Sequence, residues 1–262
     1  MSEMLSVRDV SKKYQIPGHQ RYRPVLDQLS FDVEQDRITV VVGPSGCGKT
    51  TLLNIISGLD TSFDGHIVFG NAHHKIGYMF QTPSLIPWRT VWGNVTVGCE
   101  IEHKPESAFA SRALGLLKRY GLKEFSHDYP HTLSQGMQQR VAFIRLIIFG
   151  ANFLLLDEPF ARLDPIVRRD LYSDLNSLFL EENVTVLLVT HDIEEAVLLG
   201  DKVVILSPRP ARFLAEIHIG LDRAQRINYT PGALGEMAPY LAKIWQCLRS
   251  GYDSANASDR VR

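Results

Sequence analysis

The sequence has almost no excess charge of either sign. Its 262 residues include 28 Lys and Arg against 29 Asp and Glu, which gives a formal net charge of −1. Proteins that bind nucleic acid usually carry a basic excess or a basic stripe, so this balance does not favour that class. With 45% hydrophobic and 22% charged residues, the composition is typical of a folded globular protein rather than a disordered chain.

The sequence also has few cysteines and no long apolar run. Its three cysteines lack CxxC spacing, which argues against a disulfide framework and against a zinc site. The longest apolar stretch, residues 146–156, is interrupted by Gly150 and Asn152 and falls short of the roughly 20 residues that a membrane-spanning helix needs. The first ten residues are too charged for a signal peptide. These absences predict a soluble, cytoplasmic protein.

Alternating and β-branched segments predict an α/β fold. Residues 5–10 and 29–33 alternate apolar and polar side chains at the two-residue period of a strand, and the segment 15–24 between them contains Pro and Gly and predicts a loop. Residues 38–42 are five β-branched side chains in succession, which is typical of a strand buried on both faces. Two further segments predict buried strands: residues 153–156 and 184–189. Such strands separated by helical stretches indicate a largely parallel sheet.

A helical segment interrupts this α/β pattern. No run between residues 94 and 150 is typical of a strand, and the apolar side chains of residues 106–120 recur at mostly helical spacings. After residue 221 one helix is predicted over residues 233–248, followed by a polar end that we expect to fray. We therefore expect a helical subdomain at approximately 94–150 and a separate C-terminal tail, 221–262.

The clearest motif is a glycine-rich loop directly after the buried run 38–42. It fits GxxxxGK[ST] and comprises Gly43, Pro44, Ser45, Gly46, Cys47, Gly48, Lys49 and Thr50, followed by Thr51. Glycines let backbone N–H groups converge on phosphate oxygens, and the next helix directs the positive end of its dipole at the same phosphates. Lys49 should reach the β- and γ-phosphates, and the Thr50 hydroxyl should bind Mg²⁺. This strand–loop–helix context predicts a site for a nucleoside triphosphate.

A pair of carboxylates, Asp157 and Glu158, follows the apolar run 153–156. Two acids at the end of a buried strand are costly unless they meet a cation or a reacting group. We expect Asp157 to hold Mg²⁺, directly or through water, and Glu158 to activate the attacking water as a general base. A solvated acidic turn is the alternative interpretation, and the phosphate loop in the same chain argues against it.

Four further segments give the chain a resemblance to the ATP-binding subunits of ABC transporters. They are Gln81 after residues 77–80, Leu133-Ser134-Gln135-Gly136-Met137-Gln138-Gln139-Arg140, Ala161-Arg162-Leu163-Asp164, and His191 in Val189-Thr190-His191-Asp192. They are similar to that family's Q-loop, signature motif, D-loop and switch histidine. Each match is weak alone, whereas the whole set in the family's order is specific.

The resemblance implies a P-loop NTPase fold with a RecA-like core, an antiparallel β subdomain and an inserted α-helical subdomain, all within residues 1–220. It also implies that two copies of the chain enclose two ATP molecules with Mg²⁺. In that arrangement Ser134, Gln135 and Gly136 of one copy face the γ-phosphate that the other copy holds. Ser134 should begin a helix, because serine is a good N-cap residue.

The resemblance assigns roles to other polar residues. His191 would contact the γ-phosphate, Gln81 would sense Mg²⁺ and the attacking water, and Asp164 would organise that water and the dimer contact. An aromatic side chain upstream of the phosphate loop would stack on adenine. Tyr14, which closes the first strand, is the favoured candidate, and Tyr22 is the alternative.

The resemblance extends to a subfamily, the bacterial nitrate, sulfonate and taurine importers. The similar segments are residues 81–91, Asp157-Glu158-Pro159-Phe160 and residues 206–210. Leu85, Ile86, Pro87 and Trp88 form an apolar patch after the Q-loop that suits a short helix of a membrane partner; alternatively, Trp88 packs inside the helical subdomain.

These matches imply an ATPase subunit that drives uptake of a small anion or a related organic solute from the cytoplasmic face of a bacterial membrane. Two transmembrane permease subunits and, indirectly, a solute-binding protein would complete the complex. A soluble non-transport ABC ATPase, or a regulatory ATP-binding module with weak hydrolysis, is the alternative.

Cys47 lies inside the phosphate loop, beside Lys49 and a helix N-terminus. Such surroundings lower the pKa of a thiol, so a reactive cysteine that ATP protects from alkylation is one hypothesis. A small side chain that merely fills space is the other.

Two glutamines depart from the family's signature pattern: Gln135 breaks its usual glycine pair, and Gln138 replaces a common basic residue. Ser134 and Gly136 retain the phosphate-facing geometry, so we expect Gln135→Gly to raise the steady-state ATPase rate or leave it unchanged. A large loss of turnover in that variant would show that Gln135 has a specific role.

Overall fold

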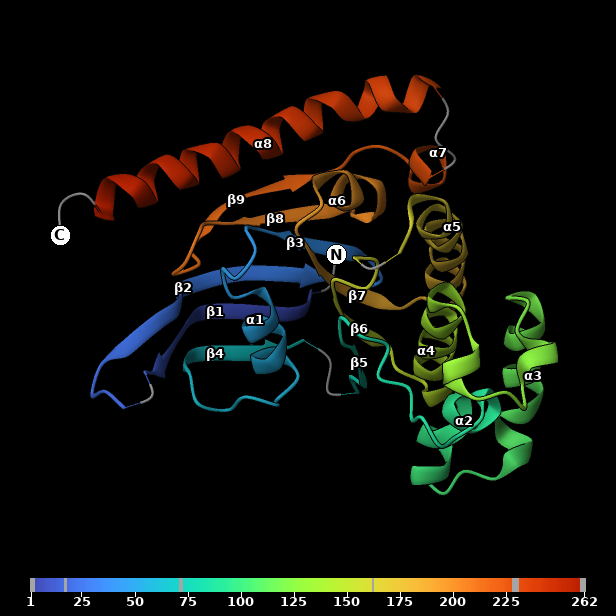
Figure 1. Cartoon of the computed structure of the whole chain (residues 1–262). Coiled ribbons are helices and arrows are strands. Elements are labelled where there is room, and N and C mark those ends of the chain that lie inside the picture. Colours follow the sequence, from blue (N-terminus) through green and yellow to red (C-terminus); the bar gives the residue numbers. More distant parts are fainter. Residues whose placement is uncertain (1–2, 17, 71–72, 162, 228–230, 260–262) are drawn as a thin grey trace. The chain divides into compact units, whose positions relative to one another are not determined.

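The computed structural model describes residues 3–16, 18–70, 73–161, 163–227 and 231–259 (Figure 1). The chain divides into two compact units. The first unit comprises Met1–His73 and Thr185–Arg262, and the second unit comprises His74–Val184. Within the described residues, no helix combines the length and the apolar character that crossing a membrane requires.

The first unit contains a three-stranded antiparallel sheet in the order β2-β1-β4. Its strands are β1 (Glu3–Gln15), β2 (Tyr22–Glu34) and β4 (Asp64–Phe69). The predicted strands at residues 5–10 and 29–33 are confirmed, whereas the predicted loop 15–24 is too long. Pro24 pairs with Lys13 inside β2, and β2 can accept this proline because it is an edge strand, where a missing N–H donor breaks no ladder bond.

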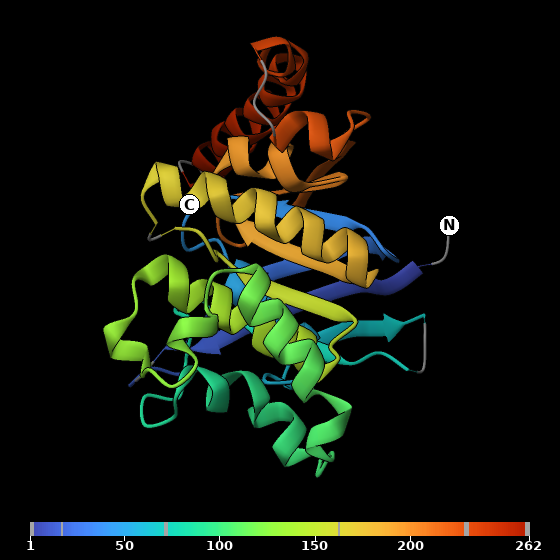
Figure 2. The ribbon, with the colours of Figure 1, turned by 90° about the vertical axis from the view of Figure 1, so that its right-hand side faces the viewer.

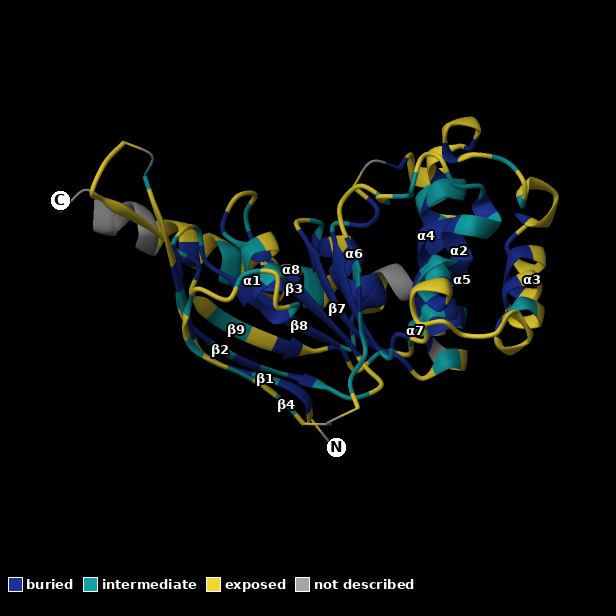
Figure 3. Cartoon of the chain, turned by 90° about the horizontal axis from the view of Figure 1, so that it is seen from below, coloured by how far each residue is buried: buried dark blue, intermediate teal, exposed yellow. Residues whose placement is uncertain are grey.

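Four further strands of the first unit lie in the order β7-β3-β8-β9. They are β3 (Ile38–Val42), β7 (Thr185–Thr190), β8 (Lys202–Leu206) and β9 (Phe213–His218). The strand β3 pairs in parallel with β7 and β8, and β9 pairs antiparallel with β8. Every residue of β3, β7 and β8 is buried (Figure 3), which confirms that the β-branched run forms a strand covered on both faces.

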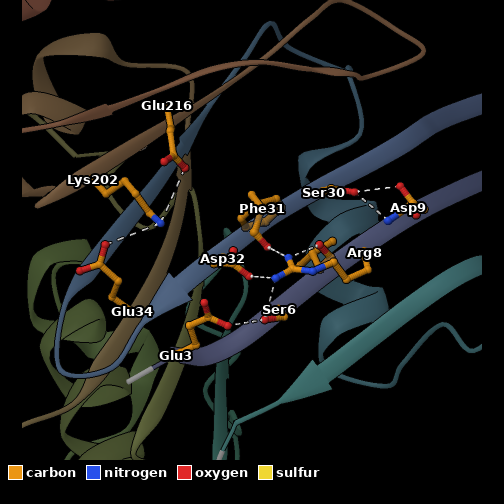
Figure 4. A network of polar contacts seen from close by, with 11 residues as sticks. Glu3, Ser6, Arg8, Asp9, Ser30, Phe31, Asp32, Glu34, Lys202 and Glu216 are labelled. Carbon is orange, nitrogen blue, oxygen red and sulfur yellow. Dashed lines mark hydrogen bonds and ion pairs between the residues drawn. The ribbon is translucent and has the colours of Figure 1, made fainter. Parts of the chain in front are cut away.

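Ion pairs accompany both groups of strands in the first unit (Figure 4). The ammonium of Lys202, a buried side chain in β8, lies 3.8 Å from a carboxylate oxygen of Glu34 and 3.8 Å from one of Glu216. On the three-stranded sheet, Arg8 pairs with Asp32 at 2.5 Å. A buried lysine between two carboxylates has the compensation that a buried charge requires.

The helices of the first unit are α1 (Lys49–Ile56), α6 (Ile193–Leu199), α7 (Arg223–Ile227) and α8 (Pro231–Asp259). The last of them, coloured red, runs along β8, β9 and α6 (Figures 1 and 2). The predicted tail helix, 233–248, is too short, because α8 extends from Pro231 to Asp259. Packing outweighs the polar composition there, because Gly251 lies against β9, where a Cβ would be 2.6 Å from Leu214 Cδ1.

The described residues of the second unit form two parallel strands and four α-helices. They are β5 (Ile76–Met79), α2 (Val91–Ile101), α3 (Ala110–Arg119), α4 (Gln135–Phe149), β6 (Phe153–Asp157) and α5 (Pro165–Glu182). Three short 3₁₀ turns, Glu106–Ala108, Lys123–Phe125 and Pro130–Thr132, separate α2, α3 and α4. Residues 94–150, which the structure describes without a gap, contain no strand, as the sequence predicts.

Candidate functional site

The phosphate loop connects β3 to α1 in the first unit. Gly46 and Gly48 have φ angles of 73° and 128°, which residues with a side chain rarely adopt. A Cβ at Gly48 would also lie 2.7 Å from Leu26 Cδ2. The Lys49 ammonium is buried and donates to the carbonyl oxygens of Gly43 at 2.8 Å and Pro44 at 3.2 Å. The loop therefore curves around a cation, as a site for phosphate requires.

The hydroxyl side chains of the loop and of the residue after it are more exposed than the loop's thiol. Ser45 and Thr50 are exposed, and Thr51 is half-buried. Cys47 is 1% exposed, and its Sγ would lie 3.0 Å from a Cβ at Gly43. This packing matches the second hypothesis for Cys47, because a buried thiol that fills space in a loop is chemically inert.

The two tyrosines considered for adenine stacking lie in adjacent strands beside the turn, Tyr14 near the end of β1 and Tyr22 at the start of β2. Tyr14 is 42% exposed; its hydroxyl donates to Asp60 at 3.0 Å, and the Lys12 ammonium lies 4.8 Å from its ring centroid. Tyr22 is 56% exposed, beneath the ammonium of Lys13. Both rings remain available to a base, and the choice between them stays a prediction.

His191 lies between β7 and α6 in the first unit, and its side chain is exposed. Two neighbours hold this turn. Asp192 caps α6 by accepting from the N–H groups of Glu194 at 2.9 Å and Glu195 at 3.2 Å, and the Thr190 hydroxyl accepts from the Asp192 N–H at 3.0 Å. The same hydroxyl donates to the buried Glu195 carboxylate. Glu195 is not among the residues predicted from the sequence, although Asp192 and Glu195 have the spacing of a capping box.

Asp157 is the last residue of β6 in the second unit, and Glu158 directly follows the strand. Asp157 is 5% exposed, and Glu158 has a φ of 44°, in the left-handed region that a residue with a side chain occupies only at a cost. Gln139 of α4 holds the turn that follows, since its amide donates to the Pro159 carbonyl at 2.5 Å. The Ala161 N–H donates to the Glu158 carbonyl at 3.2 Å. A strained backbone held from two sides is typical of a functional position.

Tyr78 of β5 lies near this acidic pair. Burial, together with the negative charge of Asp157, raises the pKa of the Tyr78 hydroxyl well above its ordinary value. The phenol therefore stays protonated at neutral pH. Its ring stacks on Phe80 with 4.2 Å between centroids, directly before Gln81, which is exposed.

The signature segment begins α4 as predicted. The Ser134 hydroxyl accepts from the Met137 N–H at 3.3 Å, and Gln135 is the exposed first residue of the helix. Gly136 is buried, and a Cβ there would lie 2.5 Å from Val167 Cγ1 of α5. Gln138 donates to the carbonyl oxygens of Pro130, in the turn before the signature segment, and of Leu133, its first residue. Gly136 and Gln138 thus have packing and bracing roles within this unit.

Asp164 caps the next helix, α5. Its carboxylate accepts from the N–H groups of Ile166 and Val167, each at 3.1 Å. Arg162, part of the predicted D-loop, lies outside the described residues. The role of Asp164 in organising water stays a prediction.

The apolar patch after the Q-loop is open to solvent at its far end. Trp88 is 77% exposed, so the alternative that it packs inside the helical subdomain is wrong. Pro87 is exposed as well, whereas Leu85 and Ile86 are half-buried.

A buried asparagine shapes the backbone under this patch. The Asn94 carbonyl oxygen accepts from the Ile86 N–H at 2.7 Å, and its amide donates to the carbonyl oxygens of Ile86, Arg89 and Thr90 at 3.0–3.1 Å. From α4, Arg145 donates to the carbonyls of Pro83 and Ser84 at 2.9 and 3.0 Å. Neither Asn94 nor Arg145 is predicted from the sequence as a functional residue, because neither belongs to a motif.

The predicted residues are divided between the units. The first unit holds Tyr14, the phosphate loop and His191; the second holds Gln81, the signature segment, Asp157, Glu158 and Asp164. The proposed Mg²⁺ ligands Thr50, Gln81 and Asp157 offer oxygen donors only, which Mg²⁺ prefers. Within the described residues no group of three or more His, Cys, Asp or Glu side chains could hold a metal ion, and Mg²⁺ in phosphate sites usually relies on one or two carboxylates with substrate oxygens.

Comparisons with known proteins agree with this geometry. Residues 26–161 match the family model described as ABC transporter. A taurine import ATP-binding protein from Rhizobium johnstonii is 38% identical over 231 residues, which cover 86% of this chain and 87% of the relative. A formylaminopyrimidine import ATP-binding protein from Halalkalibacterium halodurans is 37% identical over 230 residues, covering 88% and 90%.

Solved structures show the same fold. The dimeric structure of a bacterial ABC transporter cassette has a TM-score of 0.72 and 28% identity, covering 84% of this chain and 100% of that one. A structure of the same cassette in a post-hydrolysis state, bound to ADP and phosphate, has a TM-score of 0.71. The predicted P-loop NTPase fold is therefore confirmed.

The hydrogen bonds that Asn94 makes to the backbone predict how its replacement changes the stability of the fold. Asn94→Ala removes four hydrogen bonds and leaves buried backbone groups without partners, so we expect the free energy of unfolding to fall by about 3 kcal/mol. Asn94→Asp keeps the shape but directs a carboxylate at three carbonyl oxygens, so it should destabilise at least as much. Urea denaturation measures both variants. A mild effect of Asn94→Asp would indicate that shape alone matters at this position.

Proposed function

This chain belongs to the ABC transporter family of ATP-binding proteins, and we propose that it is the ATPase subunit of an importer for a small solute. The observation that carries the proposal is the phosphate loop, in which two left-handed glycines and the buried Lys49 ammonium form a cradle for phosphate. The chain is an ATPase that converts ATP to ADP and phosphate. We infer that it works as a dimer with ATP bound between two copies.

Each part of the loop has a separate task toward ATP. Backbone N–H groups of residues 45–50 bind phosphate oxygens, and the Lys49 ammonium turns from the Gly43 and Pro44 carbonyls toward the β- and γ-phosphates. Mg²⁺, when bound, neutralises part of the charge on these phosphates, and Thr50, Gln81 and Asp157 are the residues that would hold it. Tyr14 stacks on adenine.

Glu158, which follows β6, is the proposed acceptor of the proton that the attacking water loses. Glu158 accepts a proton from the attacking water, and the left-handed backbone fixed by Gln139 sets the direction of its carboxylate. His191, at the turn held by Thr190 and Asp192, contacts the γ-phosphate and stabilises the charge that develops there. Ser134 begins the helix that faces the γ-phosphate held by the other copy, and Asp164 organises the contact between the copies.

Glu158→Gln tests the role of the base. It keeps the size of the side chain but removes the proton acceptor, so we expect ATP binding to persist and the hydrolysis rate to fall at least about 100-fold. With ATP and Mg²⁺ the variant should elute as a dimer in size-exclusion chromatography with light scattering.

Lys49→Ala serves as the control for the Glu158→Gln experiment. It should lose ATP binding and remain a monomer under the same conditions. Rapid hydrolysis by Glu158→Gln would overturn the assignment of Glu158 as general base.

The importer assignment rests on the relatives and on the apolar patch. The matched relatives are named for import of taurine, formylaminopyrimidine and aliphatic sulfonates. We infer a small anionic or polar organic solute for this chain as well. It enters through two transmembrane permease subunits, with a solute-binding protein delivering it, and the chain works at the cytoplasmic face of the membrane.

The patch of Leu85, Ile86, Pro87 and Trp88 is the proposed contact with the permease. An exposed tryptophan beside half-buried aliphatic side chains suits a short amphipathic helix of a partner. The hydrogen bonds from Asn94 and Arg145 give this segment a fixed backbone. A rigid patch transmits movement to a partner better than a loose loop does.

Trp88→Asp should abolish solute uptake by the complete transporter while ATP binding by the purified chain is unchanged, because a charge prevents an apolar helix from docking. Uptake by proteoliposomes and nucleotide titration measure the two properties. Ile101→Asp is the matched control, because Ile101 is 71% exposed but lies at the far end of α2, roughly 15 Å along the helix from its start. Normal uptake by Trp88→Asp would exclude this contact.

A further inference from the structure

The C-terminal helix α8 has one buried edge that attaches it to the first unit. Met237 and Ile244 are 1% and 0% exposed, and Gly251 is buried against Leu214 of β9. These three residues are spaced by seven, so they lie on one edge of the helix. In addition, the Tyr240 hydroxyl accepts from the Gly220 N–H at 3.2 Å. The helix is therefore a fixed element of this unit over these residues.

A second edge of α8 is exposed and combines aromatic and basic side chains. Trp245 is 64% exposed and Tyr252 is 46% exposed; Arg249 lies between them and is exposed too. Spacings of four and three residues place them on one side of the helix, next to the buried edge. We call Trp245, Arg249 and Tyr252 the α8 stripe. Large exposed aromatic side chains on a fixed helix are typical of an interaction surface.

The α8 stripe lines a cavity that includes part of the nucleotide site. The cavity has a volume of about 1140 Å³, and its other walls are the first two residues of the phosphate loop and the start of α6 with His191 and Glu194. All of these residues belong to the first unit. The cavity therefore begins at the edge of the phosphate loop where the γ-phosphate is expected and extends to the tail helix.

We propose that this cavity receives the first turns of α5 from a second copy of the chain, so that α8 extends the ATP-dependent dimer interface. The inference rests on the proposed function, in which the D-loop that precedes α5 contacts the other copy near its γ-phosphate. What it adds is the specific contact of Ile166 and Asp170 with the α8 stripe.

The chemistry of α5 supports this occupant. Ile166 lies in the first turn of α5, after the capping residue Asp164 and the proline that starts the helix. Its large apolar side chain is 77% exposed. Asp170, four residues later on the same face, is exposed as well. An isoleucine and a carboxylate at this spacing match Trp245 and Arg249, which are also four residues apart. The contact joins an apolar pair and an ion pair across the two copies.

Cross-linking between two differently tagged chains tests the contact. Both carry Glu158→Gln, to hold the ATP-bound dimer, and Cys247→Ser, because Cys47 and Cys99 are buried and Cys247 is the more accessible of the three. One chain has Trp245→Cys and the other has Ile166→Cys. We expect a short bis-maleimide to link the two cysteines in the presence of ATP and Mg²⁺, which gives a product that carries both tags. Without nucleotide the yield of this product should be at least tenfold lower.

Lys243→Cys in place of Trp245→Cys is the matched control. Lys243 is also exposed on α8 but lies about 200° around the helix from Trp245, so it should yield at least tenfold less product. Equal yields from the two positions, or a product that forms equally without ATP, would overturn the proposal.

Charge reversal provides a test that does not depend on cross-linking. In the Glu158→Gln background, Arg249→Glu or Asp170→Arg alone should weaken ATP-dependent dimerisation about tenfold in sedimentation experiments. The two changes together restore the ion pair with reversed sign, and dimerisation should return to within about threefold of the parent. Lys243→Glu should have no effect, and thermal melting checks that every variant is folded.

The outcomes separate the inference from the function on which it rests. If the parent Glu158→Gln chain does not dimerise with ATP, the proposed function fails and the α8 contact fails with it. In a second outcome, the parent dimerises, but the cross-link is absent and the double charge reversal does not restore dimerisation. In that case only the α8 contact is wrong. Under that second outcome, the cavity would instead serve a small anion or a permease segment.

Discussion

The close packing of Gly48 against Val25 and Leu26 is the contact on which the phosphate loop depends. A Cβ at this position would lie within 2.8 Å of both side chains, and the backbone φ of 128° is one that glycine alone adopts readily. Because Val25 and Leu26 belong to β2, the antiparallel strands fix the point where the loop turns into α1. The buried Lys49 ammonium and the N-terminus of α1 then follow from that turn.

In the second unit, polar side chains of α4 support several functional segments at once. Gln139 holds the turn after Glu158, Arg145 holds the segment after Gln81, and Gln138 holds the turn before the signature segment. Each bond joins a side chain of α4 to a backbone carbonyl outside the helix, and the side chain supplies a donor to that carbonyl. One helix therefore connects the proposed base, the proposed permease contact and the surface proposed to face the second ATP. A displacement of α4 would reach all three.

Local patterns predicted much of the fold and most of the candidate site. The β-branched run of β3, the alternation in β1 and β2, the phosphate loop and the Ser134 cap each follow from short-range rules of side-chain periodicity and hydrogen bonding. Asn94 and Arg145 could not be found in this way, because their partners are backbone groups whose position depends on the folded chain. The length of α8 was underestimated for a similar reason. Its polar end lies beside Gly251, whose contact with Leu214 no local rule predicts.

Gly136 links the signature segment to the start of α5 through shape alone. A methyl group there would lie 2.5 Å from Val167 Cγ1, so the two positions share one small volume. A larger residue at 136 therefore requires a smaller residue at 167, because the same space cannot hold both side chains. The glycine of the signature segment is therefore fixed by its neighbour on α5, whatever its role toward the nucleotide.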